Sequence, residues 1–353
     1  MSENTYYLSA NTGCGYISFF DDIIASFKKV IVLKNIPNKY KKKIFDEIES
    51  KINIENVMYE RIISCGTSDE TDALIINHHS TAIVDESIIT GEVPLYADII
   101  DFINILNCDC IEKKNLAFLN CKVERIRKKM ISHLDEAKKI HDEWEKIYIS
   151  NLDFEKINNE VDVLISSVFD EVDCVDGVPD DCKRFFGTLL PRGNINYIDK
   201  ITNGFKKRIF IKGRPGTGKS TILKKFASEA RKKGYSTETY YCSLDIQSLD
   251  MVVVRELEFA VFDSTSPHEK FPEYPYDTVF DVYETGKKNN VDDYYADELM
   301  IIKNEYNDEI KKAKECLYTI QALKNETSKI LKADDKIIED IIKRIISMAS
   351  IIR

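Results

Sequence analysis

The chain has 353 residues, more than one hydrophobic core usually supports, so we expect two domains. Hydrophobic residues make up 43% of the sequence and charged residues 31%, which excludes an intrinsically disordered chain. The net charge of -10 argues against general nucleic-acid binding, because affinity for phosphate backbones depends on Lys and Arg. The sequence has no long apolar run, no basic leader and no paired cysteine spacing, so we expect a cytoplasmic protein with reduced thiols and no membrane contact.

An internal repeat organises the chain. The matching segments are, at a constant offset of 178 residues, Gly15–Asp21 with Gly193–Asp199, Phe27–Lys34 with Phe205–Lys212, and Asp85 with Asp263. We therefore predict two copies of one module, at 1–169 and 184–353. Between them, 170–183 is rich in carboxylates and contains Gly177 and Pro179, so we interpret it as an acidic surface linker and not as a metal site.

Each copy is expected to alternate strands with helices before a long helical arm. In the second copy the expected strands are 208–212, 237–243, 251–254 and 259–262, and the expected helix is 220–233. This alternation predicts an α/β fold in which each copy has a mainly parallel sheet flanked by helices.

Both arms carry apolar stripes with intervals of three and four residues. One stripe runs from Ile126 to Trp144 and the other from Leu299 to Ile320, so we expect them to pair as a hairpin or short coiled coil. The arms also offer a surface for a protein partner or for self-association. Because His141 and Trp144 lie on the first stripe, we expect them to pack in the core. A last amphipathic helix at 337–346 either closes a domain or meets a partner.

One segment matches the phosphate-loop pattern G-x-x-x-x-G-K-[ST]. With the threonine that follows, its residues are Gly213, Arg214, Pro215, Gly216, Thr217, Gly218, Lys219, Ser220 and Thr221. Glycines let successive N–H groups point at phosphate oxygens, and the start of a helix adds positive potential. We expect Lys219 to reach the β- and γ-phosphates, Ser220 to bind Mg²⁺ and Thr221 to touch the α-phosphate. The predicted ligands are ATP and Mg²⁺.

A carboxylate at the end of a nearby apolar strand would complete such a site. Asp263 follows four apolar residues, and we expect it to hold Mg²⁺ through water and to act with Lys219 in catalysis, with a turn-capping role as the alternative. Ser264 stands where many ATPases have a catalytic glutamate. Water activation would then come from elsewhere, and the candidates are Asp245, Asp250 and His268.

The first copy has lost this loop. The matching positions, 35–42, contain no glycine and retain only Pro37 and Lys41. A backbone without glycine cannot easily wrap a phosphate, so we interpret the lysines at 39, 41, 42 and 43 as a solvated charge run. Asp85 and Glu86 resemble the acid pair of a magnesium site that lacks its loop. We expect the first copy to be a scaffold or a regulatory partner.

Taken together, these motifs resemble the tandem ATPase-like proteins of low-GC Gram-positive bacteria. The resemblance covers most of the chain and rests on Lys212–Thr221, Ser248–Met251, Asp263–His268 and, in the first arm, His141–Tyr148. It implies an ATP-binding fold. Members of that family usually carry a phosphate loop in both copies, so the first copy of this chain departs from the pattern.

Three functions stay open at this point. The leading expectation is slow Mg²⁺-dependent ATP hydrolysis coupled to a conformational change, and the alternatives are a small-molecule kinase and a nucleotide sensor or scaffold that does not hydrolyse. No Asn-Lys-x-Asp guanine motif and no transporter-type Leu-Ser-Gly-Gly-Gln segment is present. No arginine lies between Arg255 and Arg344, which disfavours a kinase for phosphorylated acceptors, since such enzymes neutralise two charged substrates.

Overall fold

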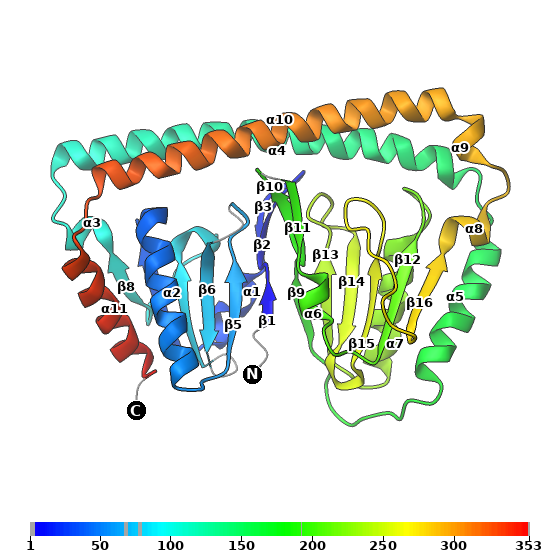
Figure 1. The fold of residues 1–353 in the computed structure, drawn as a ribbon, viewed down its shortest axis with the longest axis horizontal. Helices are drawn as coiled ribbons and strands as arrows, with labels where there is room; N and C mark the ends of the chain where they lie inside the picture. The colour runs from blue at the N-terminus through cyan, green and yellow to red at the C-terminus, as the bar shows by residue number, and fades with distance from the viewer. Residues whose placement is uncertain (1–3, 67–69, 77–79, 192, 352–353) are drawn as a thin grey trace.

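The computed structural model describes residues 4–66, 70–76, 80–191 and 193–351. Two six-stranded sheets stand side by side beneath a pair of long helices, α4 (Cys110–Ile149) and α10 (Ala296–Ile330) (Figure 1). Both sheets are mixed and mostly parallel, so the predicted α/β class is confirmed. Among the described helices, none combines the length and the apolar character that crossing a bilayer requires.

The first sheet has the strand order β1-β5-β6-β7-β4-β8. Its strands are β1 (Asn4–Tyr6), β4 (Lys29–Lys34), β5 (Tyr59–Ile63), β6 (Thr71–Ile76), β7 (Thr81–Asp85) and β8 (Asp98–Asp101). Only β6 runs antiparallel to its neighbours within this sheet. Helix α2 (Asn38–Ile54) connects β4 to β5.

The second sheet repeats this topology in the order β9-β13-β14-β15-β12-β16. Its strands are β9 (Asp181–Arg184), β12 (Lys207–Lys212), β13 (Thr237–Tyr241), β14 (Leu249–Val254), β15 (Phe259–Asp263) and β16 (Asp277–Asp281). Here β14 is the antiparallel strand. Helix α7 (Lys219–Lys232) connects β12 to β13, so the strands and the helix expected in the second copy are confirmed to within a few residues.

Alternate positions of each central strand face two different cores, as the pleat requires. In β4, Ile31 and Leu33 pack under α2, whereas Val30 and Val32 face the middle of the molecule. The middle core also takes in the inner face of the second sheet, the hairpin of β2 (Ser9–Thr12) with β3 (Gly15–Ser18), and the short helices α1 (Phe20–Ile23) and α6 (Ile198–Ile201). The second hairpin, β10 (Gly187–Leu190) with β11 (Gly193–Asn196), instead places Leu189 in the core beneath the long helices. Helix α2 therefore covers the outer face of the first sheet, and helix α7 covers the outer face of the second.

A pseudo-twofold contact joins the two sheets. Tyr7 and Phe185 exchange two backbone hydrogen bonds, with N···O distances of 2.9 and 2.8 Å. Phe185 is the counterpart of Tyr7 at the repeat offset of 178 residues. A contact between a residue and its own counterpart is the signature of a self-complementary two-fold interface. The two copies thus pack like the subunits of a symmetric dimer, within one chain.

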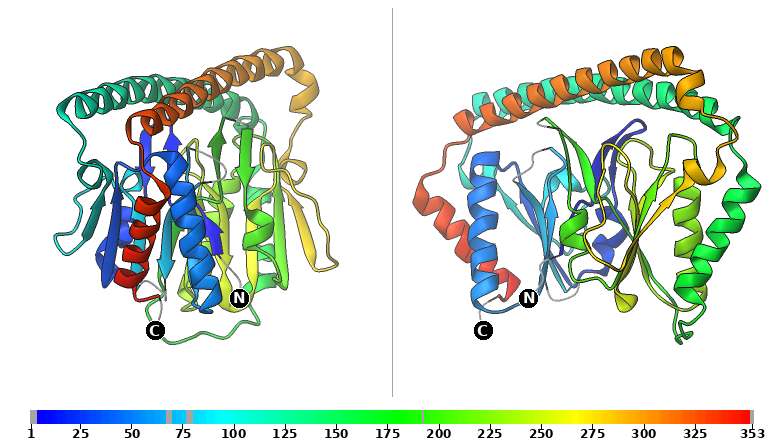
Figure 2. Two further views of the ribbon diagram at one scale, coloured as in Figure 1. Left: turned by 60° about the vertical axis from the view of Figure 1, so that its left-hand side comes forward. Right: turned by 45° about the vertical axis from the view of Figure 1, so that its right-hand side comes forward.

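The helix that follows each arm packs on the sheet of the other copy. Helix α5 (Phe154–Phe169) follows α4 in the chain but packs on α7 and the second sheet. Helix α11 (Asp335–Ala349) follows α10 but packs on α2 and the first sheet (Figures 1 and 2). The expected copies at 1–169 and 184–353 follow the repeat, whereas the packing crosses from one to the other. Residues 181–183, placed in the linker from the sequence, belong to β9.

The two arms run antiparallel across the top of the molecule (Figure 1). Their apolar stripes meet in a core that includes Met130 and Leu134 of α4 with Ala313 and Leu317 of α10. The predicted pairing of the arms is therefore confirmed. Helix α4 begins with a capping box, in which the Asp109 carboxylate accepts from two backbone N–H groups. The remaining short helices are α3 (Phe102–Ile105), α8 (Val282–Gly286) and α9 (Val291–Tyr294).

Candidate functional site

The glycine-rich loop of residues 213–218 connects β12 to α7, and its glycines are needed for its shape. Gly216 has a φ of 72° and Gly218 a φ of 91°, the left-handed region that side chains disfavour. A Cβ on Gly213 would lie 2.6 Å from the Thr217 hydroxyl, which is a clash. Thr217 is fully buried and fastens the loop from inside. The loop therefore has the sharply curled backbone that the sequence pattern predicts.

Lys219 and Asp263 face each other at this loop. The Lys219 ammonium lies 2.9 Å from the Arg214 carbonyl oxygen and 3.6 Å from Asp263 Oδ2. Asp263 is the last residue of β15, and its Oδ1 accepts hydrogen bonds from the Thr265 N–H at 2.9 Å and the Thr265 hydroxyl at 2.6 Å. One oxygen of Asp263 thus caps a turn, the alternative role considered from the sequence, and the other is directed at the lysine.

The remaining loop residues divide into two groups. The Ser220 hydroxyl lies at the start of α7 and accepts from the Leu249 N–H at 2.9 Å, which ties α7 to β14. Thr221 beside it is exposed. Arg214 turns to the opposite side and pairs with Asp292 of α9, with 2.9 Å between Nη2 and Oδ2. Asp292 also accepts from the Tyr148 hydroxyl at 2.6 Å, so Arg214 is already held by α9 and by the end of α4.

Two of the three candidates for water activation lie beside Asp263. Asp250 is near the start of β14, which runs antiparallel to β15, so its carboxyl group comes close to Asp263. Burial, and then the nearby Asp263 charge, raise the pKa of Asp250 to about 8. His268 Nε2 lies 3.9 Å from Asp250 Oδ2, and burial lowers the pKa of His268. Asp245 instead caps the turn before β14 by accepting from the Gln247 N–H at 3.1 Å.

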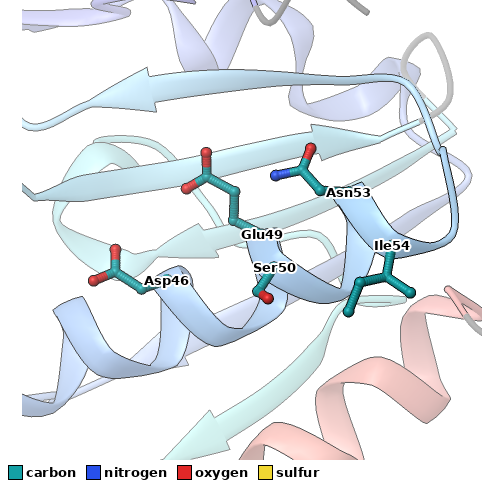
Figure 3. Close-up of a pocket in the computed structure, with 5 residues that line it drawn as sticks. All are labelled: Asp46, Glu49, Ser50, Asn53 and Ile54. Atoms are coloured by element: carbon teal, nitrogen blue, oxygen red, sulfur yellow. The ribbon is translucent and has the colours of Figure 1, made fainter.

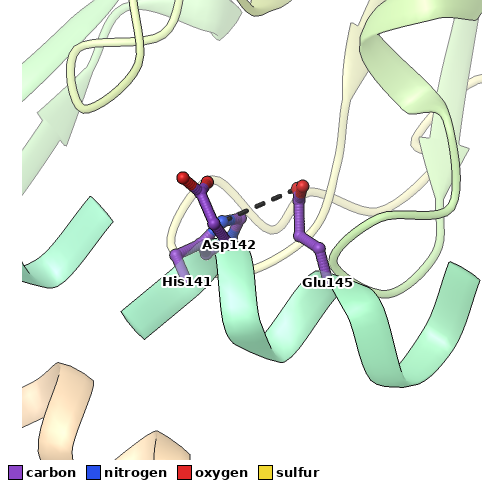
Figure 4. A group of neighbouring side chains, drawn as sticks. All are labelled: His141, Asp142 and Glu145. Carbon is purple, nitrogen blue, oxygen red and sulfur yellow. Dashed lines mark ion pairs between the residues drawn. The ribbon is translucent and has the colours of Figure 1, made fainter. Parts of the chain in front are cut away.

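The loop has a further partner that the sequence did not reveal. Glu145 of α4 places its Oε1 3.2 Å from the Gly216 N–H nitrogen, and a Cβ on Gly216 would lie 2.7 Å from the Glu145 carbonyl oxygen. His141, one helical turn earlier, has its Nδ1 3.6 Å from the same Oε1 (Figure 4). A helix of the first copy therefore sits directly on the loop of the second copy.

The expected core packing of His141 and Trp144 is found only in part, because both side chains are half-buried and only Trp144 packs against a core. Both rings lie near Tyr306 of α10, with centroid separations of 6.0 and 6.2 Å. His141 additionally faces Glu145 and the loop. The polar residues within His141–Tyr148 were the sequence signal for this contact with the loop. A local pattern could not reveal that the arm crosses to the other copy.

Two other features of the structure do not add to this site. His141, Asp142 and Glu145 offer ligand atoms within 4.8 Å of one another, but Asp142 is paired with Lys138 at 2.8 Å and Glu145 is bound to the loop. A hollow on α2 is lined by Asp46, Glu49, Ser50, Asn53 and Ile54 (Figure 3). All five belong to one helix and none belongs to the groups described above.

The equivalent region of the first copy has a different backbone. Three residues separate the end of β4 at Lys34 from the start of α2 at Asn38, whereas six separate β12 from α7. The positions matching Gly216, Thr217 and Gly218 are Asn38, Lys39 and Tyr40, and they form the first turn of α2. The curled loop of the second copy is thus replaced by helix, which agrees with the predicted loss of the phosphate loop.

Lys41, the counterpart of Lys219, is buried among three carboxylates. Its ammonium lies 2.7 Å from Asp72, 3.6 Å from Asp85 and 3.7 Å from Glu70. Burial favours the neutral amine, but the carboxylates outweigh it and raise the pKa of Lys41 above its ordinary value. The prediction of a solvated charge run is therefore wrong for Lys41, because it neutralises a buried acidic cluster. Helix α10 covers this region, and Gln321 and Lys324 line a small polar cavity beside Asp72.

Comparison of the chain with protein-family models, with curated proteins and with solved structures gives no match. The resemblance to tandem ATPase-like proteins consequently stays an expectation that rests on the motifs. The interpretation of the site has to come from its own geometry and chemistry.

Proposed function

We propose that the second copy is a P-loop nucleotide-binding module that binds ATP with Mg²⁺ and hydrolyses it slowly. The first copy is a degenerate P-loop module that binds no nucleotide and supports the second. One observation carries this proposal: the curled glycine-rich loop has Lys219 at the start of its helix and Asp263 opposite, at the end of a parallel neighbouring strand. That combination supplies amides, an ammonium and a carboxylate around one point, as a magnesium-bound triphosphate requires.

Each residue has a defined task in this proposal. The N–H groups of the loop and the Lys219 ammonium bind phosphate oxygens and offset their charge. The Ser220 hydroxyl and Asp263 Oδ2 are hard oxygen ligands of the kind that Mg²⁺ prefers. Ser220 lies at the start of α7, and Asp263 lies at the end of β15, the parallel neighbour of β12. Mg²⁺ would add neutralisation of the charge that develops on the phosphates. Positioning and charge stabilisation would therefore account for most of the catalysis.

The surroundings of Asp263 favour slow hydrolysis. Ser264 follows it in place of a carboxylate, and the Ser264 hydroxyl is fully buried and bonded to the Lys270 backbone at 2.7 and 3.0 Å. Asp250 has a pKa near 8 and holds its proton at neutral pH, which makes it a poor base. His268 is the better acceptor, since burial keeps its imidazole neutral. The same lack of a strong base favours, as a second candidate function, a nucleotide sensor that does not hydrolyse.

The arms provide the route for coupling to a conformational change. Helix α4 leaves the first sheet, crosses to the loop of the second copy and continues into α5, which packs on α7 (Figure 1). A change at the loop would therefore act on a helix that is anchored in both copies. We propose conformational change along this helix as the output of nucleotide turnover.

The test is MgATP turnover and nucleotide binding by the full chain, with Lys219→Ala and a matched control on the same helix. Lys232→Ala is suitable, because Lys232 is exposed and pairs with Glu229, one turn away on the same helix. We expect Lys219→Ala to lower nucleotide affinity at least about 100-fold, since it removes a charge-assisted contact to two phosphates. Lys232→Ala should match the wild type. Unchanged binding and turnover in Lys219→Ala would contradict the proposal.

A further inference from the structure

The Glu145 carboxylate occupies a position that suits a phosphate oxygen. Its Oε1 accepts from the Gly216 N–H at 3.2 Å, and this N–H belongs to the loop whose amides are proposed to hold phosphates. Carboxylate and phosphate oxygens use such N–H groups in the same way, as charged acceptors. Both cannot accept the same N–H in one geometry. The Glu145 carboxylate therefore occupies, at the Gly216 N–H, a position that a phosphate oxygen would take.

Within the part of the chain that the structure describes, no lysine or arginine forms an ion pair with Glu145; Lys138 is close enough to interact with its charge, but its ammonium is paired with Asp142. His141 Nδ1 is 3.6 Å from Glu145 Oε1, but burial lowers the pKa of His141, so the ring is neutral at pH 7. Lys219 directs its ammonium to the Arg214 carbonyl and to Asp263. An approaching triphosphate would therefore meet the Glu145 carboxylate at the Gly216 N–H group that it needs.

Helix α4 is fastened to the loop at two points, so displacement of Glu145 would be felt along the helix. The first is the close approach of Gly216, where the α4 backbone leaves no room for a Cβ. The second is the chain of contacts from Arg214 through Asp292 to the Tyr148 hydroxyl, with distances of 2.9 and 2.6 Å. Just before the first point, the ring of Trp144 packs near Tyr306 of α10.

We propose that Glu145 is a built-in competitor for the phosphate site, which a nucleotide phosphate displaces from Gly216, and that the displacement is passed to the first copy through α4. The inference rests on the proposed function, because it assumes that the loop binds phosphate. It adds a regulatory contact from the arm of the opposite copy. It also implies that the resting protein binds nucleotide less tightly than the loop alone would allow.

Affinity for the non-hydrolysable β,γ-imido analogue of ATP, with Mg²⁺, tests the competition. The full chain is compared with Glu145→Gln, Glu145→Ala and the control Glu143→Gln, an exposed glutamate on the same helix that pairs with Lys146. We expect Glu145→Ala to bind about 5- to 30-fold more tightly than the wild type, because a charged acceptor no longer has to be displaced. Glu145→Gln should fall between the two, and Glu143→Gln should equal the wild type.

The outcomes separate this inference from the proposed function. If the wild type binds the analogue and Lys219→Ala does not, but both Glu145 variants bind it no more tightly than the wild type, the competitor role is wrong and the proposed function stands. A loss of MgATP turnover at saturation in Glu145→Gln with unchanged affinity would also overturn it, because Glu145 would then act in catalysis. If neither the wild type nor any Glu145 variant binds the analogue, both proposals fall.

Hydrogen exchange at the end of α4 tests the displacement itself. In the wild type, the analogue should speed amide exchange in the peptide that spans 138–149, because the helix loses its contact with the loop. In Glu145→Ala the exchange of that peptide should already be faster without nucleotide. Slower exchange in the wild type on adding the analogue would contradict displacement.

Discussion

Lys41 of the first copy and Lys219 of the second lie 178 residues apart at the same point of the repeat, each near two aspartates from adjacent antiparallel strands. The Lys41 ammonium is buried and lies 2.7 Å from Asp72 Oδ1. The Lys219 ammonium donates to the Arg214 carbonyl oxygen and lies 3.6 Å from Asp263 Oδ2. The loop before the lysine makes the difference. Without glycines the helix starts about one turn earlier and its lysine packs among the carboxylates. Matching residues therefore form a buried ion cluster in the first copy and lie beside the glycine-rich loop in the second.

The arms above the two regions differ as well. Over the intact loop, α4 presents the Glu145 carboxylate to a backbone N–H. Over the degenerate region, α10 presents Gln321 and Lys324 to a small cavity beside Asp72. Each arm belongs to the opposite copy, so each region is completed by the other half of the chain. Four changes should break or sharpen this comparison.

The largest effect is expected from separating the copies. Residues 178–353 expressed alone would lose the end of α4, the connection that follows it and α5. These segments supply six buried apolar side chains to the second core, namely Tyr148, Leu152, Ile157, Val161, Val168 and Phe169. At about 1.5–3 kcal/mol each, this loss is comparable to the whole stability of a domain. We expect this fragment to be unfolded by circular dichroism and thermal denaturation, and to fold when co-expressed with 1–177. A fragment that melts cooperatively on its own would show that the helix exchange is dispensable.

Removal of the buried cation in the first copy should come next. Lys41→Met leaves Asp72, Asp85 and Glu70 close together without their shared ammonium, so we expect the free energy of unfolding to fall by about 3–5 kcal/mol in denaturant titrations. Lys42→Ala is the neighbouring control. Lys42 is half-exposed and pairs with Asp46 on the same helix, so its loss should cost roughly 0–1 kcal/mol. Equal effects of the two changes would indicate that Lys41 is solvated in solution.

The matched aspartates should respond with opposite signs. Burial and Asp263 raise the pKa of Asp250 from 3.8 to about 8, so the folded state binds a proton that the unfolded state releases, and wild-type stability should fall as pH rises from about 4 to 8. Asp250→Asn removes this titration. Its stability relative to the wild type should increase between pH 5 and pH 8 by more than about 1.4 kcal/mol, the equivalent of one pKa unit.

Asp72→Asn is the matching change in the first copy, and it should destabilise the chain at both pH values, because Asp72 makes the shortest contact to the buried Lys41. Denaturant unfolding of both variants at pH 5 and pH 8 measures the contrast. If Asp250→Asn loses as much stability at pH 8 as Asp72→Asn does, Asp250 is ionised and paired in the folded protein.

Local signals predicted the parts of the molecule that depend on neighbours in the chain. The apolar runs of β12 and β15, the glycine loop and the helix after it all follow from short segments. Asp181 shows where such signals fail. Its charge suggested a linker, but its Oδ1 accepts from the Thr237 and Thr239 hydroxyls at 3.1 and 2.8 Å, which places it in β9. Hydrogen bonds from a neighbouring strand satisfy the Asp181 carboxylate, which from the sequence alone was expected to be exposed to solvent.

The helix exchange and the burial of Lys41 were missed for the same reason. The amphipathic faces of α5 and α11 show that each must pack on something, but periodicity does not say on which copy. Likewise, Lys41 lies in a run of lysines, and only the fold brings Glu70, Asp72 and Asp85 around it. Glu145 contacts the glycine-rich loop because α4 crosses from the first copy to the second, so this contact could not be derived from either copy by itself.

The most direct test of the difference between the two copies is the number of nucleotides bound per chain. Titration of the full chain with the β,γ-imido analogue of ATP and Mg²⁺, followed by native mass spectrometry, should give one molecule bound to the wild type and none bound to Lys219→Ala. Two molecules per chain, or one that persists in Lys219→Ala, would contradict the assignment of nucleotide binding to the glycine-rich loop of the second copy alone.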